Sequence, residues 1–302
     1  MRKLRSSLLV LTCFGCVAES ANPPAPAALP ADRAASSPSE QALRVEYRPE
    51  LGEVIAKAGY VGTFVLLDPA SERLIVAEPE PIAGASSLAE TRFVPASTFK
   101  IPHSLIALET GVADGPEFAL AWDGVVHDIE AWNHDHVLRT AYRDSVVWYY
   151  QELARRIGTE PMQHFVDAFE YGNRDIGAAI DRFWLDGELR ISPREQVEFL
   201  RRLHEGQLPV SDANLAIMLD DVMVRERRSD GTLIRAKTGW AQSSEQNLGW
   251  FVGSVERGDR GRVYFATLIQ AGEPAPDSFR SDRVDLSMAL LGQLGWLEQA
   301  PL

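Results

Sequence analysis

The stretch Pro95-Ala96-Ser97-Thr98-Phe99-Lys100 stands where an irregular segment rich in Gly, Ala and Ser gives way to an apolar helical pattern. Proline is common at the start of a helix, because its missing N–H would find no partner there. On such a helix Ser97 and Lys100 are three residues apart and share one face. The free N–H groups and positive dipole end of a helix N-terminus also favour a developing oxyanion.

Ser97 is a weak nucleophile unless a neighbouring base takes its proton. The amine of Lys100 is such a base only if burial among apolar groups lowers its pKa. The chain has four lysines, Lys3, Lys57, Lys100 and Lys237, and arginine, which cannot lose its proton, carries most of the other positive charge. This usage favours an activated nucleophile, although a solvated pair on a surface helix and a biased base composition would explain the same residues.

Composition limits the size of the core and the class of partner. The 302 residues are 45% hydrophobic, which is enough for a substantial core, and the length is long for one domain and short for two large ones. The net charge of −13 argues against nucleic acid or anionic lipid as a partner.

The N-terminus has the composition of an export signal over residues 1–20. Arg2, Lys3 and Arg5 precede an apolar stretch, 8–17, that is too short to span a bilayer. The chain is therefore expected to be exported to the periplasm.

Two fates of this leader stay open. Cleavage after Ser20 gives a soluble protein, whereas lipidation of Cys16 tethers the chain to the outer membrane. Residues 21–42 are rich in Pro, Ala and Ser and have the composition of a linker. Both cysteines lie in the leader, so a cysteine nucleophile is excluded from the catalytic domain expected over 43–302.

Hydrophobic periodicity predicts strands at both ends of this domain and helices between them. The predicted fold is therefore α/β, of the α+β type: a central antiparallel sheet flanked by helices, whose first and last strands meet, with a helical subdomain inserted at about 111–225. The active site is expected between sheet and helical lobe. The expected strands are 62–68, 73–77, 232–237, 248–256 and 262–270, and the expected helices 49–59, 97–110, 142–157, 161–169, 193–203, 213–223 and 283–294.

Three further short motifs follow Ser97-x-x-Lys100 in the chain: Ser145-Val146-Val147, Tyr171-Gly172-Asn173 and Lys237-Thr238-Gly239. Each is weak by itself, but their order and spacing are specific. With these motifs the chain, over about residues 60–297, resembles the class D (oxacillinase-type) serine β-lactamases of the penicillin-recognising serine enzymes. The resemblance extends to Trp122-Asp-Gly, Trp132-Asn, Phe183-Trp-Leu and Gly249-Trp-Phe-Val-Gly.

The resemblance implies a β-lactamase/transpeptidase-like fold and hydrolysis of the β-lactam ring of penicillin-type antibiotics, which gives resistance. Ser97 would form the acyl-enzyme. Lys100 would be an N6-carboxylysine, made with carbon dioxide or bicarbonate, that acts as general base and is held by the indole N–H of Trp184. This modification requires a neutral amine and hence an apolar pocket, for which Phe99, Val147, Trp184 and Leu185 are suitable walls. No metal is implied.

The other roles also come from the resemblance. Ser145 would pass a proton to the departing lactam nitrogen, and the backbone N–H groups of Ser97 and Trp240 would form the oxyanion hole. Lys237, Thr238 and an arginine would bind the substrate carboxylate; Arg283 has the best spacing and Arg280 is the alternative. The remaining expected substrate-binding residues are Val147, Tyr171, Asn173, Leu185 and Gly239.

Two features differ from related patterns. His103 stands where asparagine is expected in many relatives, one helical turn from Lys100, and either alters the polarity of the pocket or simply packs behind the helix. No Ser-Asp-Asn triplet is present, which argues against a class A enzyme. Substrate preference would depend on loops at 221–230 and 242–246, and the protein would be a monomer or a homodimer.

Three alternatives remain. A β-lactam sensor or a peptidoglycan transpeptidase or carboxypeptidase would acylate at the same serine but turn over slowly. A metal-dependent hydrolase would use His134 and His136 with His127, although this segment resembles a loop and lacks a third ligand at convincing spacing. A catalytically silent wall-binding protein has no motif in its favour.

Overall fold

The computed structural model describes residues 43–79 and 86–298. The expected leader, the linker and Cys16 lie outside the described residues. Within the described part, no helix has the length and apolar character needed to cross a membrane.

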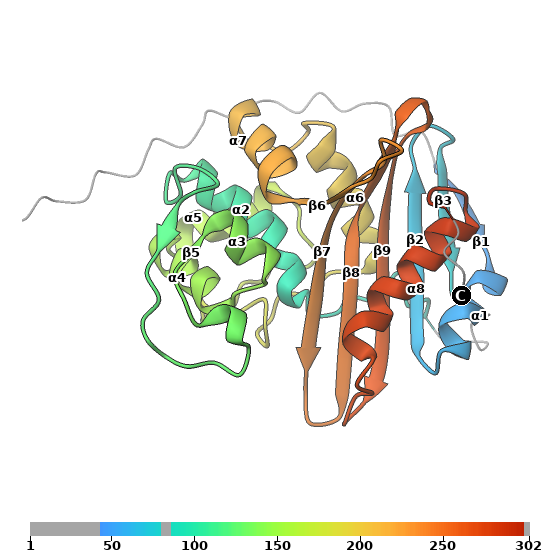
Figure 1. Ribbon diagram of the computed structural model, residues 1–302, viewed down its shortest axis with the longest axis horizontal. Coiled ribbons are helices and arrows are strands. Elements are labelled where there is room, and N and C mark those ends of the chain that lie inside the picture. Colours follow the sequence, from blue (N-terminus) through green and yellow to red (C-terminus); the bar gives the residue numbers. More distant parts are fainter. Residues whose placement is uncertain (1–42, 80–85, 299–302) are drawn as a thin grey trace, which may run out of the picture.

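The centre of the molecule is a sheet with the strand order β1-β3-β2-β9-β8-β7-β6 (Figure 1). Neighbouring strands are antiparallel except β1 and β3, which run parallel. A separate small sheet pairs β4 with β5. The strands are β1 Arg44–Tyr47, β2 Val61–Asp68, β3 Arg73–Ala77, β4 Ala119–Leu120, β5 His136–Val137, β6 Val224–Arg227, β7 Leu233–Gln242, β8 Gln246–Arg257 and β9 Gly261–Gly272.

The predicted contact between the two ends of the domain is confirmed. β2 pairs with β9, the last strand, from Val61 opposite Gln270 to Leu67 opposite Tyr264. β1, which the sequence pattern did not predict, precedes β2 in the chain and forms a short edge strand beside β3. With four residues, two of them charged, β1 has the brevity and charge that commonly protect a sheet edge.

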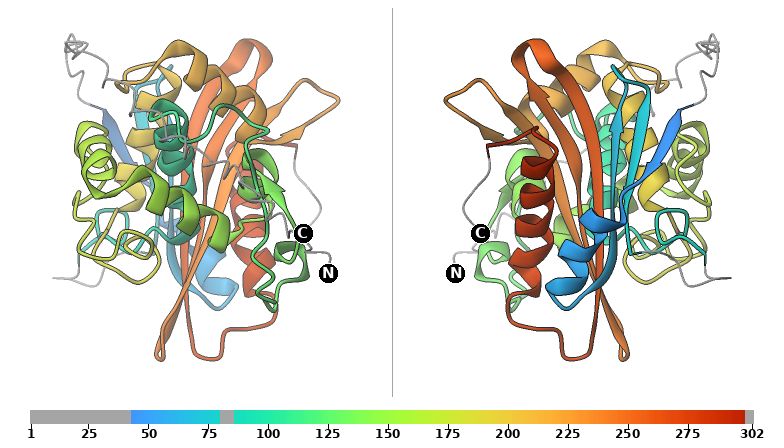
Figure 2. Two further views of the ribbon diagram at one scale, coloured as in Figure 1. Left: turned by 90° about the vertical axis from the view of Figure 1, so that its left-hand side faces the viewer. Right: turned by 90° about the vertical axis from the view of Figure 1, so that its right-hand side faces the viewer.

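Helices cover both faces of the sheet (Figure 2). α1 (Pro49–Lys57) and α8 (Phe279–Gln293) lie side by side on one face, and α6 (Pro193–His204) packs on the other with the helical lobe. Consecutive residues of β2 pack alternately into the cores on the two faces of the sheet, because successive strand side chains point to opposite faces. Val65 and Leu67 join the core of the helical lobe, whereas Phe64 and Leu66 join the core under α1 and α8.

The helical lobe differs from the expectation at one functional position. Instead of a single helix over 142–157, α3 (Leu138–Arg143) and α4 (Val147–Ile157) are separated at Ser145, whose φ is +61°. The N–H of Val146 donates to Ala141 O, and that of Ser145 to Tyr142 O. This is a Schellman ending with Ser145 in the left-handed position that glycine usually holds. The other helices of the lobe are α2 Lys100–Glu109, α5 Thr159–Ala168 and α7 Asp212–Ile217.

Several elements near the β6 edge of the sheet, and the last helix, have bounds that differ from those expected. The loop expected at 221–230 contains β6, and the helix expected over 213–223 ends at Ile217 and continues as a wider turn, Met218–Val222. β7 extends to Gln242 instead of ending at Lys237, and α8 begins at Phe279. The motif Lys237-Thr238-Gly239 therefore lies inside a strand.

Candidate active site

Ser97 and Lys100 lie at the junction between a 3-10 turn, Ala96–Phe99, and helix α2. The Nζ atom of Lys100 donates to the Oγ atom of Ser97 at 3.0 Å. Ala96 has a φ of +50°, a region that costs a residue with a Cβ about 1–2 kcal/mol. Backbone strain of this kind is common at functional sites, and here it lies next to Ser97, the expected nucleophile.

Lys100 is fully buried, and this burial alone lowers the pKa of its amine to about 7. Its Nζ atom lies 4.9 Å from the centre of the Tyr150 ring. Near neutral pH a large fraction of the Lys100 side chain is therefore the free amine, which can take a proton from Ser97 or react as a nucleophile.

Trp184 supplies a hydrogen-bond donor to the same pocket. Its ring is fully buried and stacks on Phe99, with centroids 5.9 Å apart. The Nε1 atom of Trp184 is buried and has no hydrogen-bond partner among the described residues. A buried N–H without a partner costs about 1–3 kcal/mol, so this donor would fit the carboxyl group that the resemblance implies on Lys100.

The motif Tyr171-Gly172-Asn173 lies behind this pocket and does not line the cleft. Asn173 accepts a hydrogen bond from the Arg190 N–H at 2.8 Å and donates to Glu188 O at 2.8 Å. A Cβ on Gly172, whose φ is +57°, would lie 1.9 Å from Arg190 O. The motif thus closes the base of the segment 174–190, which carries Trp184 and Leu185.

Tyr171 is also a support for the nucleophile turn. Its fully buried ring packs edge-on against Phe99 and Phe199, with centroids 5.5 and 5.0 Å away. Gln196, in contact with the Tyr171 hydroxyl, donates to Thr98 Oγ1 at 2.9 Å. The structure therefore places Tyr171 and Asn173, two expected substrate-binding residues, where they orient other parts of the site.

Ser145 and Lys237 form the second polar pair. The Nζ atom of Lys237 donates to Ser145 Oγ at 2.7 Å and to Thr238 O at 3.1 Å. Burial, followed by the charges of Lys100, Arg283 and Arg225, lowers the pKa of Lys237 well below its usual value. Lys237 is therefore able to exchange a proton with the Ser145 hydroxyl.

Gly239 allows β7 to approach the nucleophile turn. A Cβ at this position would come within 3.0 Å of Pro95 O and 3.1 Å of the Thr98 side chain. The next residue, Trp240, is 37% exposed at the rim, and its indole donates to Asn247 at 2.9 Å. The two expected oxyanion donors, on Ser97 and Trp240, thus belong to adjoining elements, and their role stays a prediction.

A cleft of about 730 Å³ joins these groups between β7, α8 and the helical lobe. Among the expected site residues, those that line it are Ser97, Ser145, Val147, Leu185, Thr238, Gly239, Trp240 and Arg283. The cleft is also lined by Arg143, Asp144 and Arg225, which no sequence motif indicates. Arg225 lies on β6, Val224–Arg227, where three consecutive charged residues give no strand signal.

Arg280 and Arg283 both line the cleft, in different ways. Arg283 is 6% exposed and donates to Gly239 O, which ties α8 to β7. Burial, then the charges of Arg280 and Arg225, lowers the pKa of Arg283 to about 10. Arg280 is exposed, and each guanidinium lies 5.9 Å from the centre of the Trp240 ring. Either can face a substrate carboxylate at this wall.

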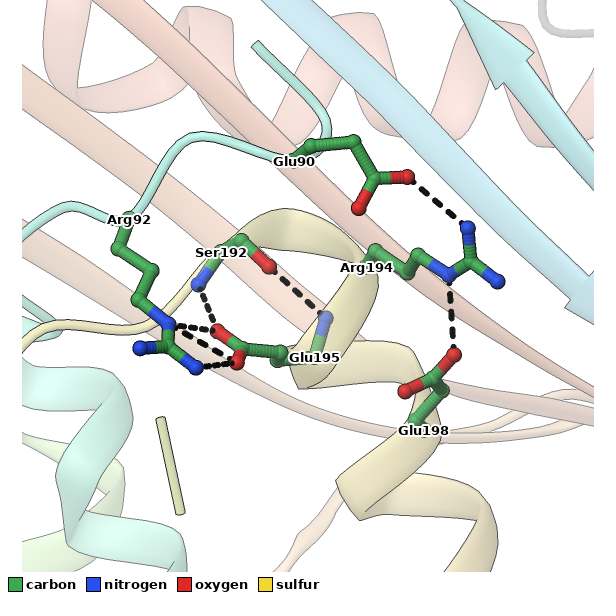
Figure 3. A pocket seen from close by; sticks show the side chains of 6 residues that line it. All are labelled: Glu90, Arg92, Ser192, Arg194, Glu195 and Glu198. Carbon is green, nitrogen blue, oxygen red and sulfur yellow. Dashed lines mark hydrogen bonds and ion pairs between the residues drawn. The ribbon is translucent and has the colours of Figure 1, made fainter. Parts of the chain in front are cut away.

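A second hollow, of about 650 Å³, lies at the start of α6 (Figure 3). Its charged side chains already pair with one another: Arg92 with Glu195, and Arg194 with Glu90 and Glu198. Ser192 caps α6 by accepting the Glu195 N–H at 3.2 Å. This hollow is therefore explained by helix capping and ion pairs.

Two of the three histidines considered for metal binding, His134 and His136, use their rings in other contacts. His136 uses both ring nitrogens, one with Ala131 O at 2.9 Å and the other with Thr140 Oγ1 at 3.1 Å. The ring of His134 stacks on that of His136, with centroids 4.1 Å apart. Among the described residues, no group of three or more His, Cys, Asp or Glu side chains is placed to hold a metal ion.

Comparisons with known proteins agree with this geometry. Residues 62–284 match the penicillin binding protein transpeptidase domain. The chain is 48% identical to β-lactamase OXA-48 of Klebsiella pneumoniae over 180 residues, which make up 60% of this chain and 66% of that protein. It is 34% identical to regulatory protein BlaR1 of Bacillus licheniformis over 206 residues, 68% of this chain but 33% of that one.

A solved structure extends the similarity to the whole fold. The class D β-lactamase YbXI from Nostoc superposes with a TM-score of 0.75 at 38% identity, covering 83% of this chain and 100% of that one. The seven-stranded sheet, the Ser97–Lys100 pair and these matches lead to one conclusion. The chain belongs to the penicillin-binding transpeptidase-domain family and, within it, to the class D serine β-lactamases, which are hydrolases of β-lactams.

Proposed function

We propose that this protein hydrolyses the β-lactam ring of penicillin-type antibiotics through an acyl-enzyme on Ser97, in a catalytic domain spanning 43–302, and so confers antibiotic resistance. The observation that carries the proposal is the 3.0 Å hydrogen bond between Lys100 and Ser97, together with a pKa of Lys100 near 7. A base of this pKa is well matched to catalysis at neutral pH.

The pocket of Lys100 fits carboxylation of its amine. Burial supplies the neutral amine, and the unpartnered Nε1 of Trp184 supplies a donor for the new carboxyl group. Bound in this way, carbon dioxide provides a carboxylate that serves as general base. Leu185 and Val147 line the adjoining wall of the cleft and limit the entry of water to the pocket.

Each remaining residue has a task in this proposal. Ser97 attacks the lactam carbonyl from the helix start, where the Ser97 and Trp240 N–H groups stabilise the oxyanion. Ser145 gives its proton to the lactam nitrogen and is reprotonated through Lys237, 2.7 Å away. Lys237 and Thr238 bind the substrate carboxylate, together with Arg283 or its alternative Arg280.

Turnover with and without bicarbonate tests this function. We would incubate the purified protein with a chromogenic cephalosporin and a penicillin, beside Lys100→Ala and the control Lys57→Ala, whose lysine is exposed. Turnover that bicarbonate stimulates, and that only Lys100→Ala abolishes, supports the proposal.

A different result identifies the alternative function. A single stoichiometric burst with a stable adduct on Ser97 would make the protein a β-lactam sensor or a slowly deacylating penicillin-binding protein; one relative, BlaR1, is named a regulatory protein. The lifetime of the acyl-enzyme decides between them. No reaction at Ser97 would exclude both.

Export to the periplasm is also part of the proposal. The basic and apolar leader supports it, and Cys16 keeps a lipid tether open. Fractionation of cells that express wild type and Cys16→Ser separates these fates, because only a lipidated protein would move from the membrane to the soluble fraction on this change. Sedimentation of the purified protein distinguishes monomer from homodimer.

A further inference from the structure

His103 is enclosed by the aromatic rings that form the lysine pocket. It lies one turn after Lys100 on α2 and has no exposed surface. Ring centroids of Phe99, Tyr150 and Trp184 lie 5.6, 5.2 and 5.1 Å from that of His103. The imidazole therefore belongs to the wall of the pocket and does not pack behind the helix.

Both ring nitrogens of His103 are buried and have no hydrogen-bond partner among the described residues. A neutral imidazole has one N–H donor and one acceptor, and each costs about 1–3 kcal/mol when buried without a partner. His136, by contrast, uses both its nitrogens. Two unpaired nitrogens on one buried ring indicate that a polar group can bind beside His103 in this pocket.

Most polar groups near His103 are already hydrogen-bonded to other atoms. The Tyr150 hydroxyl pairs with Ser104 Oγ at 2.7 Å, and Ser104 also donates to the Lys100 carbonyl. The Nε1 of Trp184 is itself without a partner, and the ring of Trp184 meets that of His103 edge-on, at 71°. The Nζ of Lys100 lies over the Tyr150 ring that His103 also touches. Two free N–H donors thus share the pocket with the reactive amine.

We propose that His103 is a positioning residue which, together with Trp184, holds the carboxyl group carried by Lys100, by donating its ring N–H to a carboxylate oxygen. This inference rests on the proposed function. Carboxylation joins Nζ to the carbon of carbon dioxide, and one Nζ proton leaves to water. The N–H groups of His103 and Trp184 then donate to the negatively charged carboxylate and stabilise it in a pocket formed largely by aromatic rings. They thereby slow the loss of carbon dioxide from Lys100.

The neutral form of His103 suits this role. Burial, and then the charge of Lys100, lowers the pKa of His103 to about 3, so the ring is uncharged at neutral pH. An uncharged N–H donor can bind the carboxylate without adding a second positive charge to the pocket. The tautomer is free to place the N–H on whichever nitrogen faces the group.

Carbon-13 NMR with labelled bicarbonate measures the carboxylated fraction of Lys100 directly, without any β-lactam. His103→Leu removes both nitrogens at similar volume, and His103→Asn keeps an N–H donor. We expect His103→Leu to raise the bicarbonate concentration for half-carboxylation about tenfold, the value of one hydrogen bond to a charged group. His103→Asn should stay within about threefold of wild type.

Thermal unfolding separates this role from a structural one. In buffer free of carbon dioxide, His103→Leu should unfold at a higher temperature than wild type, because an apolar side chain replaces two unpaired polar atoms. Added bicarbonate should then stabilise wild type more than the variant, since it binds the folded state of wild type more tightly.

The outcomes are distinct. Equal bicarbonate midpoints and equal bicarbonate shifts in wild type and His103→Leu would overturn the role of His103 and leave the proposed function intact; a buried water would then be the partner of the ring. Absence of any carbamate signal in wild type would overturn both this inference and the carboxylated base.

Discussion

Ser145 combines a hydroxyl, to which the proposed function gives a catalytic role, with a backbone conformation that favours glycine. Its φ of +61° places it at the left-handed end of α3, where a Cβ costs about 1–2 kcal/mol. A serine at this position therefore carries a backbone strain that glycine would avoid. Strained residues of this kind are common at functional sites.

Two variants separate the backbone of Ser145 from its hydroxyl. Ser145→Gly and Ser145→Ala both lose the hydrogen bond with Lys237, so their difference isolates the backbone. We expect the glycine variant to have the higher free energy of unfolding, by about 1 kcal/mol, the reverse of the usual order in a helix. Urea unfolding measures it. Both should lose about 100-fold or more in turnover. A more stable alanine variant would contradict the strain.

The pKa of Lys100 sets a pH dependence for carboxylation. Below a pKa of about 7 the amine is increasingly protonated, and an ammonium cannot react with carbon dioxide. At fixed bicarbonate, we expect the carboxylated fraction to fall as the pH drops below 7, with the required bicarbonate concentration rising about tenfold per pH unit, because one proton must be released from the ammonium. Carbon-13 NMR from pH 5.5 to 8 checks this. A midpoint that does not change with pH would contradict it.

At the scale of elements, the segment 174–190 is held closed by the Tyr171-Gly172-Asn173 turn. We expect Asn173→Ala to cost about 1–3 kcal/mol of unfolding free energy, because the Arg190 N–H and Glu188 O lose their partner. Trp184 would then be less well placed, so turnover should fall and be restored by high bicarbonate. If bicarbonate fails to restore it and KM rises instead, Asn173 contacts substrate as first expected.

Most elements could be predicted from the sequence because their residues have strong periodicity. The hairpin of β2 and β3, the long strands β8 and β9 and helices α5 and α6 lie close to their expected positions. The missed features lack a local signal. β1 and β6 are short and charged, and the break at Ser145 uses a residue other than glycine in the left-handed position.

The site was predictable to a similar extent, and for a similar reason. The order of the motifs indicates Ser97, Lys100, Ser145 and Lys237. In the structure they form two hydrogen-bonded pairs, Ser97 with Lys100 and Ser145 with Lys237. Tyr171 was expected to bind substrate but is buried behind the cleft. A short motif indicates which residues matter but not where their side chains point. Arg225 reaches the cleft through the pairing of β6 with β7, a long-range contact that spacing does not reveal.

At the scale of the whole molecule, the charge of the cleft opposes the charge of the chain. The protein carries a net charge of −13, yet Arg225, Arg280 and Arg283 meet at one wall of the cleft. Such a local field attracts anionic β-lactams and is screened by salt. We expect kcat/KM for a penicillin to fall as ionic strength rises from about 0.02 to 0.5 M.

A matched pair of variants tests the origin of this effect. Arg280→Gln should flatten the salt dependence, whereas Arg156→Gln, an exposed arginine paired with Glu152 on α4 and not among the cleft residues, should leave it unchanged. Stopped-flow acylation rates at several salt concentrations give the slopes. A kcat/KM that increases with salt would mean that the overall negative charge dominates.

The pairing of β2 with β9 has a consequence for when the domain is able to fold. The two strands are separated by about two hundred residues, so the centre of the sheet cannot close until the chain has been synthesised almost to its last helix. Long-range strand pairing of this kind makes folding slow. If the protein is exported unfolded, as proposed above, this order of strands would keep the turn that carries Ser97 unassembled until the chain has crossed the membrane.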